Sequence, residues 1–416
     1  MRWTWKRCFV AALLALCGIA AGMPEAAAHG ERAQEPFLRT RTLHWYDVTW
    51  STDKMNVNDE IVVSGKVRVY DDWPVNIPEP STVHLGNATP GPVFVRKASY
   101  IDGVPMIQSA GLELNREYDF RIVLQARVPG HHHVHPMINV KDAGGLVGPG
   151  KWIEVGGAWE DFKYPVTTLT GAKIDNLETF GVGNVVFWHG IWAVLAAFWL
   201  LWWVLRPMLL PRNILVRAGG FENLLVTRTD KIVGAGLLVA TIAVVTAGYY
   251  WAEATYPRTI PLQAGRAKIE VPPPPEDKIK VKIERATYDV PGRSMKMALR
   301  VTNNLDHPVQ LGEFATANLR FVDFGLAPAA ASVSPTYPKD LVARNGLKID
   351  DNTPLNPGES RAIKVEATDV AWEVERLTSF INDPDSRFGA LLFFYDNQQA
   401  RHIATIGGPI VPTFVR

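Results

Sequence analysis

The chain has 416 residues, a formal net charge of +1 and 47% hydrophobic residues. This length suffices for two or three domains with substantial cores. The near-neutral charge excludes nucleic acid as an expected partner, because neutralising phosphates requires a basic surface. Thirty prolines and fourteen tryptophans favour loop-rich β domains and linkers over helical bundles.

Residues 1–28 have the pattern of a secretory signal peptide. A basic start precedes an apolar run at 9–21 that is too short to span a bilayer, and the alanines at 26–28 predict cleavage after the last of them. A lipoprotein anchored at Cys17 is the alternative, but Leu16 is a poor match for the small residue expected there. Both cysteines of the chain lie in this segment, so the mature protein is expected to fold without disulfides in an oxidising compartment.

The region 29–178 is predicted to be an exported β domain. Segments 60–70 and 118–128 are rich in β-branched residues and alternate in part between apolar and polar side chains. Turn signals such as those at 129–130 and 144–145 separate the segments. Short strands with frequent turns predict a β-sandwich.

Four of the chain's ten histidines lie within five positions, in the stretch PGHHHVHPMINV at 129–140. On a strand, alternate side chains share one face, which would group His131, His133 and His135 and turn His132 to the other side. Imidazoles without nearby thiols suit zinc, copper, iron or nickel, and affinity among divalent ions is highest for copper. A surface turn whose histidines only form hydrogen bonds is the alternative, but the clustering favours a metal site.

Cleavage at the predicted position would make His29 the first residue of the mature chain. Its free α-amine and its ring Nδ1 could then bind one ion together, because the pKa of such an amine, ~7.7–8, lets a metal displace the proton. With His133 and His135, the set becomes three imidazoles and one amine, which favours copper over zinc.

The remaining histidines give weaker signals. His44 is a further candidate ligand, although its aromatic neighbours favour a packed core position. His189 falls within an apolar segment near its outer end, where an ionisable residue is by default a functional candidate. Glu31 and Glu35 could accept hydrogen bonds around the site. Three scattered histidines are interpreted as structural: His84, His307 and His402.

The region 179–253 contains two segments long enough to cross a membrane, at about 185–205 and 232–252. Two buried helices of a soluble protein are the alternative, but such helices normally have a polar face. The connecting loop carries an excess of basic residues, which predicts that it is cytoplasmic and that both flanking domains are periplasmic. Its charged residues are Arg206, Arg212, Arg217, Arg228 and Lys231 against Glu222 and Asp230.

The region 254–416 begins with a proline run at 272–275 that predicts a stiff spacer. Segments 278–283, 295–302 and 390–395 then show strand patterns. The chain is therefore predicted to be mostly β, with two β-sandwich domains joined by two transmembrane helices.

Several blocks of sequence resemble the B subunits of the copper membrane monooxygenases, the family of particulate methane monooxygenase and ammonia monooxygenase. They are HGERAQEPFLR (29–39), RTLHWYD (41–47), GPVFVR (91–96), HVH (133–135), GPGKW (148–152), RTIPLQAG (258–265), VPGR (290–293) and DPDSRFG (383–389). The blocks run from the predicted mature start almost to the end of the chain, in one order.

This resemblance implies that both β domains are cupredoxin-like and periplasmic. It implies a copper site at His29, His133 and His135, the A and C membrane subunits as partners, a trimer of heterotrimers, and the bacterial inner membrane as location. O2 and a small substrate would react, with quinol as the electron donor. A second copper position of some members needs a histidine pair, which falls here on His44 and Arg68; since arginine does not ligate copper, we do not expect that site.

The resemblance leaves the substrate open between two subfamilies. The stretches QEPF (34–37), HHH (131–133) and RPMLLPR (206–212) are similar to ammonia monooxygenase, which we expect. GPGKWIE (148–154) and LLFF (391–394) are closer to the methane enzymes, so methane or a short alkane is the alternative. A periplasmic copper carrier or scaffold without turnover is the second alternative.

Overall fold

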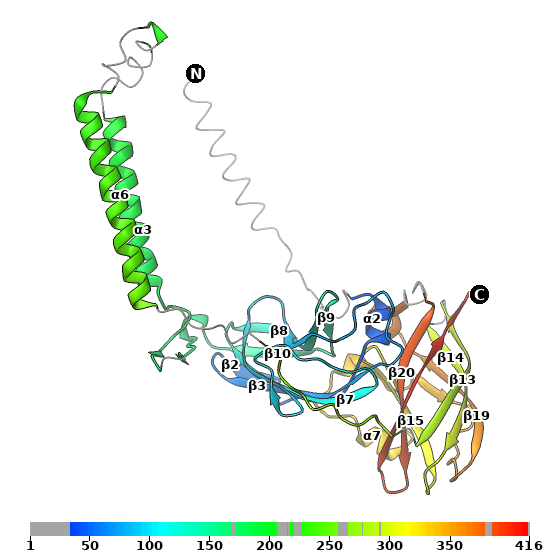
Figure 1. The fold of residues 1–416 in the computed structure, drawn as a ribbon. Helices are drawn as coiled ribbons and strands as arrows, with labels where there is room; N and C mark the ends of the chain where they lie inside the picture. Colours follow the sequence, from blue (N-terminus) through cyan, green and yellow to red (C-terminus); the bar gives the residue numbers. More distant parts are fainter. Residues whose placement is uncertain are drawn as a thin grey trace, which may run out of the picture. The chain divides into compact units, whose positions relative to one another are not determined.

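The computed structural model describes residues 34–168, 171–205, 214, 217–219, 226–256, 265–276, 278–290, 293–378 and 385–414. The predicted signal peptide, His29 and Glu31 lie outside the described residues. The chain forms two compact units (Figure 1). One contains both β regions, and the other, from Lys163 to Pro261, contains the two long helices.

The N-terminal β region is a sandwich of two sheets preceded by the short helix α2 (Pro36–Arg41). One sheet has the strand order β1 (Leu43–Trp50), β3 (Glu60–Val69), β7 (Arg116–Ala126), β5 (Phe94–Ile101), β6 (Val104–Pro105). The other has the order β2 (Lys54–Asn56), β10 (Lys151–Gly156), β8 (Gly130–Val140), β4 (Val83–Ala88), with β9 (Gly144–Val147) paired to β8. A 3₁₀ turn, η1 (Trp159–Asp161), follows.

Alternating side chains of these strands fill the space between the sheets. In β3, Ile61, Val63 and Val67 are buried at every second or fourth position, as expected for a strand with one face on the core. Trp45 of β1 packs edge-on against Phe120 of β7, with ring centroids 5.0 Å apart. The core thereby fixes the position of β1, whose His44 pairs with Arg68 of β3.

The C-terminal β region is also a sandwich. One sheet has the order β18 (Leu347–Ile349), β19 (Ser360–Thr368), β14 (Ser294–Asn303), β13 (Ile279–Asp289), β22 (Val411–Thr413). The other has the order β17 (Val342–Ala343), β16 (Leu319–Val322), β15 (Val309–Thr316), β20 (Arg387–Asp396), β21 (Arg401–Pro409). The connections contain α7 (Ala327–Ala331), η2 (Lys339–Leu341) and α8 (Ala371–Val374).

Strand β20 is buried along nearly its whole length, which explains its continuous run of apolar residues. The strand predicted at 390–395 is confirmed, and its lack of polar positions follows because a strand with both faces covered has no solvent side. Tyr46 of the N-terminal region belongs to the same apolar cluster as Leu391, Phe393 and Tyr395 of β20. The two sandwiches share this core and so form one unit.

Two buried arginines and one half-buried arginine extend the contact between the sandwiches. Arg39 of α2 donates from Nη1 to the Glu375 carbonyl at 2.7 Å and from Nη2 to the Glu375 carboxylate at 3.3 Å. Arg41 binds the Asp385 carboxylate at 2.7 Å. From the other side, Arg401 of β21 binds the Asp47 carboxylate at 2.7 Å. The segment that follows the predicted mature N-terminus is thus fastened to the C-terminal sandwich.

The second unit is a pair of antiparallel helices, α3 (Val182–Val204) and α6 (Arg228–Thr255), preceded by a hairpin of β11 (Val166–Thr167) and β12 (Lys173–Ile174). Near one end Trp188 packs beside Trp251, and near the other Trp202 donates to the Asp230 carboxylate at 3.1 Å. A capping box formed by Thr227 and Asp230 begins α6.

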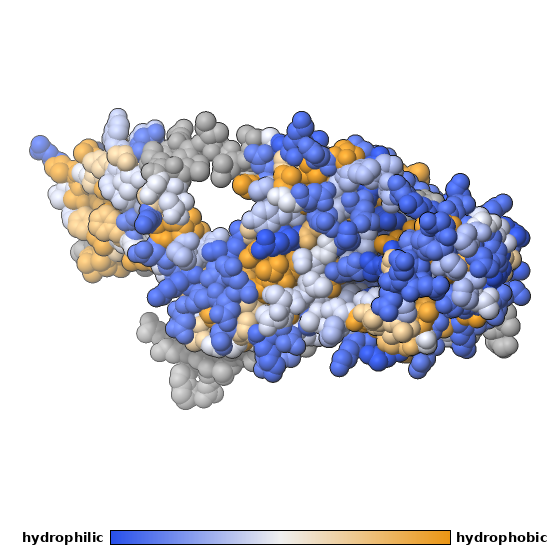
Figure 2. Space-filling model, turned by 90° about the horizontal axis from the view of Figure 1, so that it is seen from below, coloured by the Kyte–Doolittle hydropathy of each residue, from blue (hydrophilic) through white to orange (hydrophobic). Residues whose placement is uncertain are grey.

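Both helices are long and apolar enough to cross a membrane, and their apolar side chains are exposed rather than packed into a protein core. In Figure 2, hydrophobic residues gather over the helices, whereas hydrophilic residues dominate the visible face of the β unit. The predicted mostly β chain with two sandwiches and two such helices is confirmed. Residues 163–178, which we predicted as part of the N-terminal domain, group with the helices.

Candidate metal centre

The histidine-rich stretch forms β8, which pairs with β4 on one side and β10 on the other. His133 lies opposite Trp152 of β10, and His135 lies opposite Ala88 of β4. Both imidazoles are buried, with 6% and 2% of their surface exposed. The predicted strand therefore carries two histidines inside the protein at the i and i+2 positions, so their rings lie on one face.

The two rings direct nitrogens toward each other. His133 Nδ1 and His135 Nε2 are 2.9 Å apart, and the rings are nearly perpendicular with centroids 4.3 Å apart. The other nitrogen of His135 donates its N–H to the Gly148 carbonyl at 3.0 Å. This bond orients the ring and makes Nε2, which faces His133 Nδ1, the nitrogen that carries the lone pair, as backbone carbonyls do for ligating histidines.

The nitrogen separation allows both atoms to bind one ion. Ligands ~2.0 Å from an ion stand ~2.8 Å apart at a right angle and ~3.3 Å apart at a tetrahedral angle. The observed 2.9 Å falls within this range and is also the length of a hydrogen bond between the two rings. The nitrogen-only donor set, rather than the distance, therefore indicates the class of ion, namely those that imidazole ligates, with copper among them.

The indole of Trp152 covers the pair from the β10 side. It stacks on His133 with ring centroids 4.8 Å apart, and the exposed ring of His131 lies 6.1 Å away on the same indole. Stacking restricts the rotation of the His133 ring. None of the described contacts joins His131 to the facing nitrogens of His133 and His135. His131 therefore lies next to the candidate site and is not part of it.

The loop that follows β9 is shaped around His135. A Cβ added at Gly150 would lie 2.2 Å from Cε1 of His135, and one added at Gly148 would lie 2.8 Å from Trp45 and Pro136 side chains. Only glycine allows the backbone to approach this closely. The GPGKW block, which supported the family resemblance, is thus the wall of the candidate metal centre.

The segment from Gln34 to the end of α2, here called the N-terminal arm, contacts the same loop. Gln34 accepts a hydrogen bond from the Val147 amide at 3.0 Å and donates to the Gly145 carbonyl. Gly148, the next residue after Val147, holds His135. The first described residues of the chain are therefore tethered one residue from the carbonyl that orients a candidate ligand. Sequence reasoning did not single out Gln34 for this role.

His44 occupies a packed core position. It is 4% exposed, its ring packs edge-on against Tyr70, and burial, aided by the charge of Arg68, lowers its pKa to about 3. Arg68, directly opposite in the sheet, binds Thr405 at 2.9 Å and the Glu117 carboxylate at 2.8 Å. The pair of positions that could form a second copper site holds an imidazole beside a guanidinium, which opposes a metal ion.

Other predicted residues lie outside the centre. His132 packs against Phe94 and bonds the Val128 carbonyl at 2.8 Å. His189 donates to the Val185 carbonyl of its own helix at 2.8 Å. Glu35 is exposed at the start of α2, and His84 is exposed on β4. Nothing among the described contacts links these four side chains to the His133–His135 pair.

His307 and His402, interpreted as scattered structural histidines, lie together in the fold. Strand pairing between β15, β20 and β21 brings them together, with His307 Nε2 3.3 Å from His402 Nε2, and Asp396 beside both. A separation of 95 residues in sequence hid this cluster.

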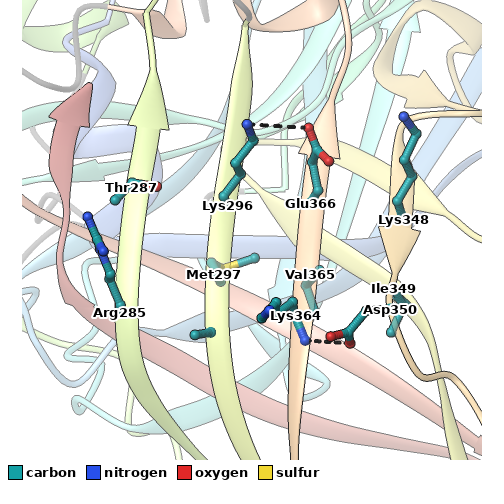
Figure 3. A pocket seen from close by; sticks show the side chains of 11 residues that line it. Arg285, Thr287, Lys296, Met297, Lys348, Ile349, Asp350, Lys364, Val365 and Glu366 are labelled. Atoms are coloured by element: carbon teal, nitrogen blue, oxygen red, sulfur yellow. Dashed lines mark hydrogen bonds and ion pairs between the residues drawn. The ribbon is translucent and has the colours of Figure 1, made fainter. Parts of the chain in front are cut away.

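A hollow of about 470 Å³ on the sheet formed by β13, β14, β19 and β18 offers no comparable chemistry (Figure 3). Lys296 lies 4.0 Å from Glu366, and Asp350 accepts a hydrogen bond from the backbone amide of Lys364 at 2.7 Å. The described histidines, rather than this hollow, carry the candidate chemistry.

A family model for the B-subunit protein of monooxygenases matches residues 30–414. The chain belongs to this family. The match confirms the resemblance inferred from the sequence blocks, and it includes His133, His135, the GPGKW loop and both long helices.

The particulate methane monooxygenase alpha subunit of Methylococcus capsulatus is 46% identical to this chain over 407 residues. The match covers 97% of this chain and 96% of that relative. The chain is therefore similar in length to a whole subunit.

Solved structures give weaker similarities. The cupredoxin domain of amoB from Nitrosocaldus yellowstonii matches at 16% identity and a TM-score of 0.24, covering 29% of this chain and 91% of that domain. Fibronectin(III)-like modules of CbhA from Clostridium thermocellum match at 7% identity and a TM-score of 0.14, covering 89% and 95%. The description of the fold rests on the sheet topology and not on these similarities.

Proposed function

We propose that this chain is the copper-binding B subunit of a membrane-bound copper monooxygenase, and that the ligands are His133, His135 and the amine and ring of His29. The observation that carries the proposal is the buried His133–His135 pair, whose nitrogens are 2.9 Å apart. Membership of the monooxygenase B-subunit family supports it.

The reach of the N-terminal arm supports His29 as the third ligand. Four residues lie between it and Gln34, and an extended chain covers at most ~17 Å over these five steps. Because Gln34 is tethered at Val147, beside the loop that holds His135, this length suffices. Ligation by the amine also requires cleavage after Ala28, since an amide nitrogen at that position would have no free lone pair.

The residues of this chain would prepare the site before an ion arrives. The Gly148 carbonyl fixes the orientation of His135, and Trp152 limits rotation of His133. Burial of both rings excludes bulk water from the ligands. Bound copper would supply one-electron redox chemistry at an all-nitrogen site with an open position. The protein would thus hold copper in a fixed geometry at the periplasmic face of the membrane.

The balanced reaction of such a complex takes one substrate, one O2, two protons and two electrons, and releases the hydroxylated product and one water. A membrane quinol is the proposed electron donor. The partner A and C subunits, in a trimer of heterotrimers, would cover the exposed apolar surfaces of α3 and α6, because such helices associate with other helices in the bilayer.

Two candidate substrate classes remain: ammonia, and methane or a short alkane. The stretches at 34–37, 131–133 and 206–212 favour ammonia oxidation to hydroxylamine. The 46% identical relative is named for methane, which favours the methane reaction. Supplying each substrate to the purified complex with a quinol, and measuring hydroxylamine or methanol, decides between them.

Native mass spectrometry of the complex tests the proposal, because one spectrum gives the mature start, the copper count and the partner chains. We expect a mature start at His29 and one copper fewer per chain in His133→Ala and in His135→Ala. His84→Ala is the matched control, since it removes an exposed histidine of the same domain. One extra residue before His29 should also abolish tight binding. An unchanged copper count in both His133 and His135 variants would refute the proposal.

A copper carrier would bind copper through the same histidines but would release it to a chelator and show no oxidation of either substrate. The carrier alternative is excluded if the wild-type complex oxidises substrate and the His135→Ala complex loses both its copper and this activity.

A further inference from the structure

The C-terminal sandwich contains a second group of converging ligand atoms. His307 Nε2, His402 Nε2 and Asp396 Oδ2 form a triangle with sides of 3.3, 3.1 and 3.1 Å. The three side chains come from different elements: the loop between β14 and β15, strand β21, and the end of β20. Of the residues that the structure describes, this is the group of three potential ligands that could hold one ion.

The Asp396 carboxylate is held so that one oxygen remains for an ion. Its Oδ1 accepts hydrogen bonds from the Gln398 amide at 2.8 Å and the Ala400 amide at 2.9 Å, in the turn between β20 and β21. Its Oδ2 faces both imidazoles. Because the carboxylate is buried, its orientation does not depend on solvent.

A second carboxylate orients His307. The Nδ1–H of His307 donates to the Asp306 carboxylate at 2.6 Å, and most metal-ligating histidines have a hydrogen bond of this kind. The fully buried Asn303 bonds the His307 carbonyl at 2.9 Å and the Leu355 carbonyl at 2.8 Å, which fixes the loop. In the neutral tautomer, Nε2 therefore presents a lone pair to the Asp396 oxygen, and a cation between them relieves the repulsion.

The size of the triangle matches a small ion. For an ion ~2.05 Å from each ligand, its sides of 3.3, 3.1 and 3.1 Å lie between the ~2.9 Å of a right angle and the ~3.3 Å of a tetrahedral angle. An ion ~2.05 Å from all three atoms would lie ~0.9 Å out of their plane, between the ~0.7 Å of a tetrahedron and the ~1.2 Å of an octahedron. Two imidazoles, one carboxylate and an open position form a donor set typical of zinc.

We propose that His307, Asp396 and His402 bind a divalent ion of the zinc class, with water as the remaining ligand. This site is independent of the proposed copper centre. The ion would join the β14–β15 loop to the β20–β21 hairpin. Strand β21 also carries Arg401 and Thr405, which contact Asp47 and Arg68 of the N-terminal sandwich. The bound ion would thus brace the strand through which the two sandwiches meet.

The test uses the whole detergent-purified complex, stripped with a chelator, reloaded with copper and then titrated with Zn²⁺ alone. Elemental mass spectrometry counts both metals. We expect His307→Ala and His402→Ala each to lower the total of bound ions by one per chain, with His84→Ala as control. Asp306→Asn, a change at an exposed side chain, should retain the site but weaken Zn²⁺ binding by ten- to a hundredfold.

If both His307→Ala and His402→Ala bind as many metal ions as the wild type, the proposal is overturned. The two imidazoles and the Asp396 carboxylate would then be joined by a shared proton and not by a metal ion. His133→Ala separates the two proposed sites: it should lower the copper count and leave the zinc count unchanged. A loss in His402→Ala without a loss in His133→Ala would refute the copper centre and retain the zinc site.

Discussion

Replacing Gly150 by alanine should disrupt the His133–His135 pair without removing either ligand. The added Cβ would lie 2.2 Å from Cε1 of His135, whereas real Cβ contacts shorter than 3.0 Å essentially do not occur. The ring must therefore move by about 1 Å, which exceeds the ~0.2 Å tolerance of metal–ligand distances several times over. We expect copper affinity to fall by about tenfold to a hundredfold, and stability to fall by ~1–3 kcal/mol from the overpacking.

Gly86→Ala is the matched control, because it lies on the neighbouring strand β4 and its Cβ would meet only Arg96 Nη1 at 3.4 Å. Copper retention against a competing chelator measures the affinity, and the Cu(II) electron paramagnetic resonance spectrum reports the ligand geometry. Thermal unfolding verifies that both variants are folded. If Gly150→Ala retained copper as tightly as Gly86→Ala with an unchanged spectrum, the assignment of His135 as a ligand held by this loop would be wrong.

Three further predictions concern the arm and the core. Gln34→Ala removes two hydrogen bonds of the arm, worth ~1 kcal/mol each, and should weaken copper retention about tenfold in the chelator assay; an unchanged affinity would contradict the tether. Arg39→Leu removes the cation that lies beside the buried Glu375 carboxylate and should cost ~3–5 kcal/mol, seen as a lower thermal midpoint. Lys54→Ala, at an exposed pair, should leave the midpoint nearly unchanged, and equal midpoints in the two variants would contradict the buried pairing. Burial lowers the pKa of His44 to about 3 in the folded protein, so as the pH falls below ~6.5 the unfolded chain takes up a proton at this residue before the folded protein does. The free energy of unfolding should therefore decrease by up to ~1.4 kcal/mol per pH unit between pH ~6.5 and pH 3. His44→Phe should remove this pH dependence in chemical unfolding, and a pH dependence that persists would come from another group.

Sequence patterns identified the helices and strands that can be recognised from neighbouring residues alone. Alternation located β3 and β7, and continuous apolar runs located α3 and α6. The i, i+2 spacing placed His133 and His135 on one strand face, because the side-chain period of a strand is fixed by backbone geometry. These predictions needed no knowledge of distant partners.

Contacts between remote segments were not predictable in the same way. The burial of β20 on both faces depends on Tyr46 and its surroundings, more than three hundred residues earlier. The grouping of His307 with His402 depends on the register of β20 against β15 and β21. A single sequence records neither register, so the histidines there had no visible partner.

The pairing of Arg39 with Glu375 spans 336 residues, and that of Arg41 with Asp385 spans 344. Since a polypeptide is made and exported from its amino end, the arm emerges first and its anchors emerge among the last residues. Closing so long a loop is slow and must await the distant strands. The anchors at Arg39 and Arg41 would therefore form only after synthesis is complete, and a prematurely terminated chain would hold its arm by the Gln34 tether alone.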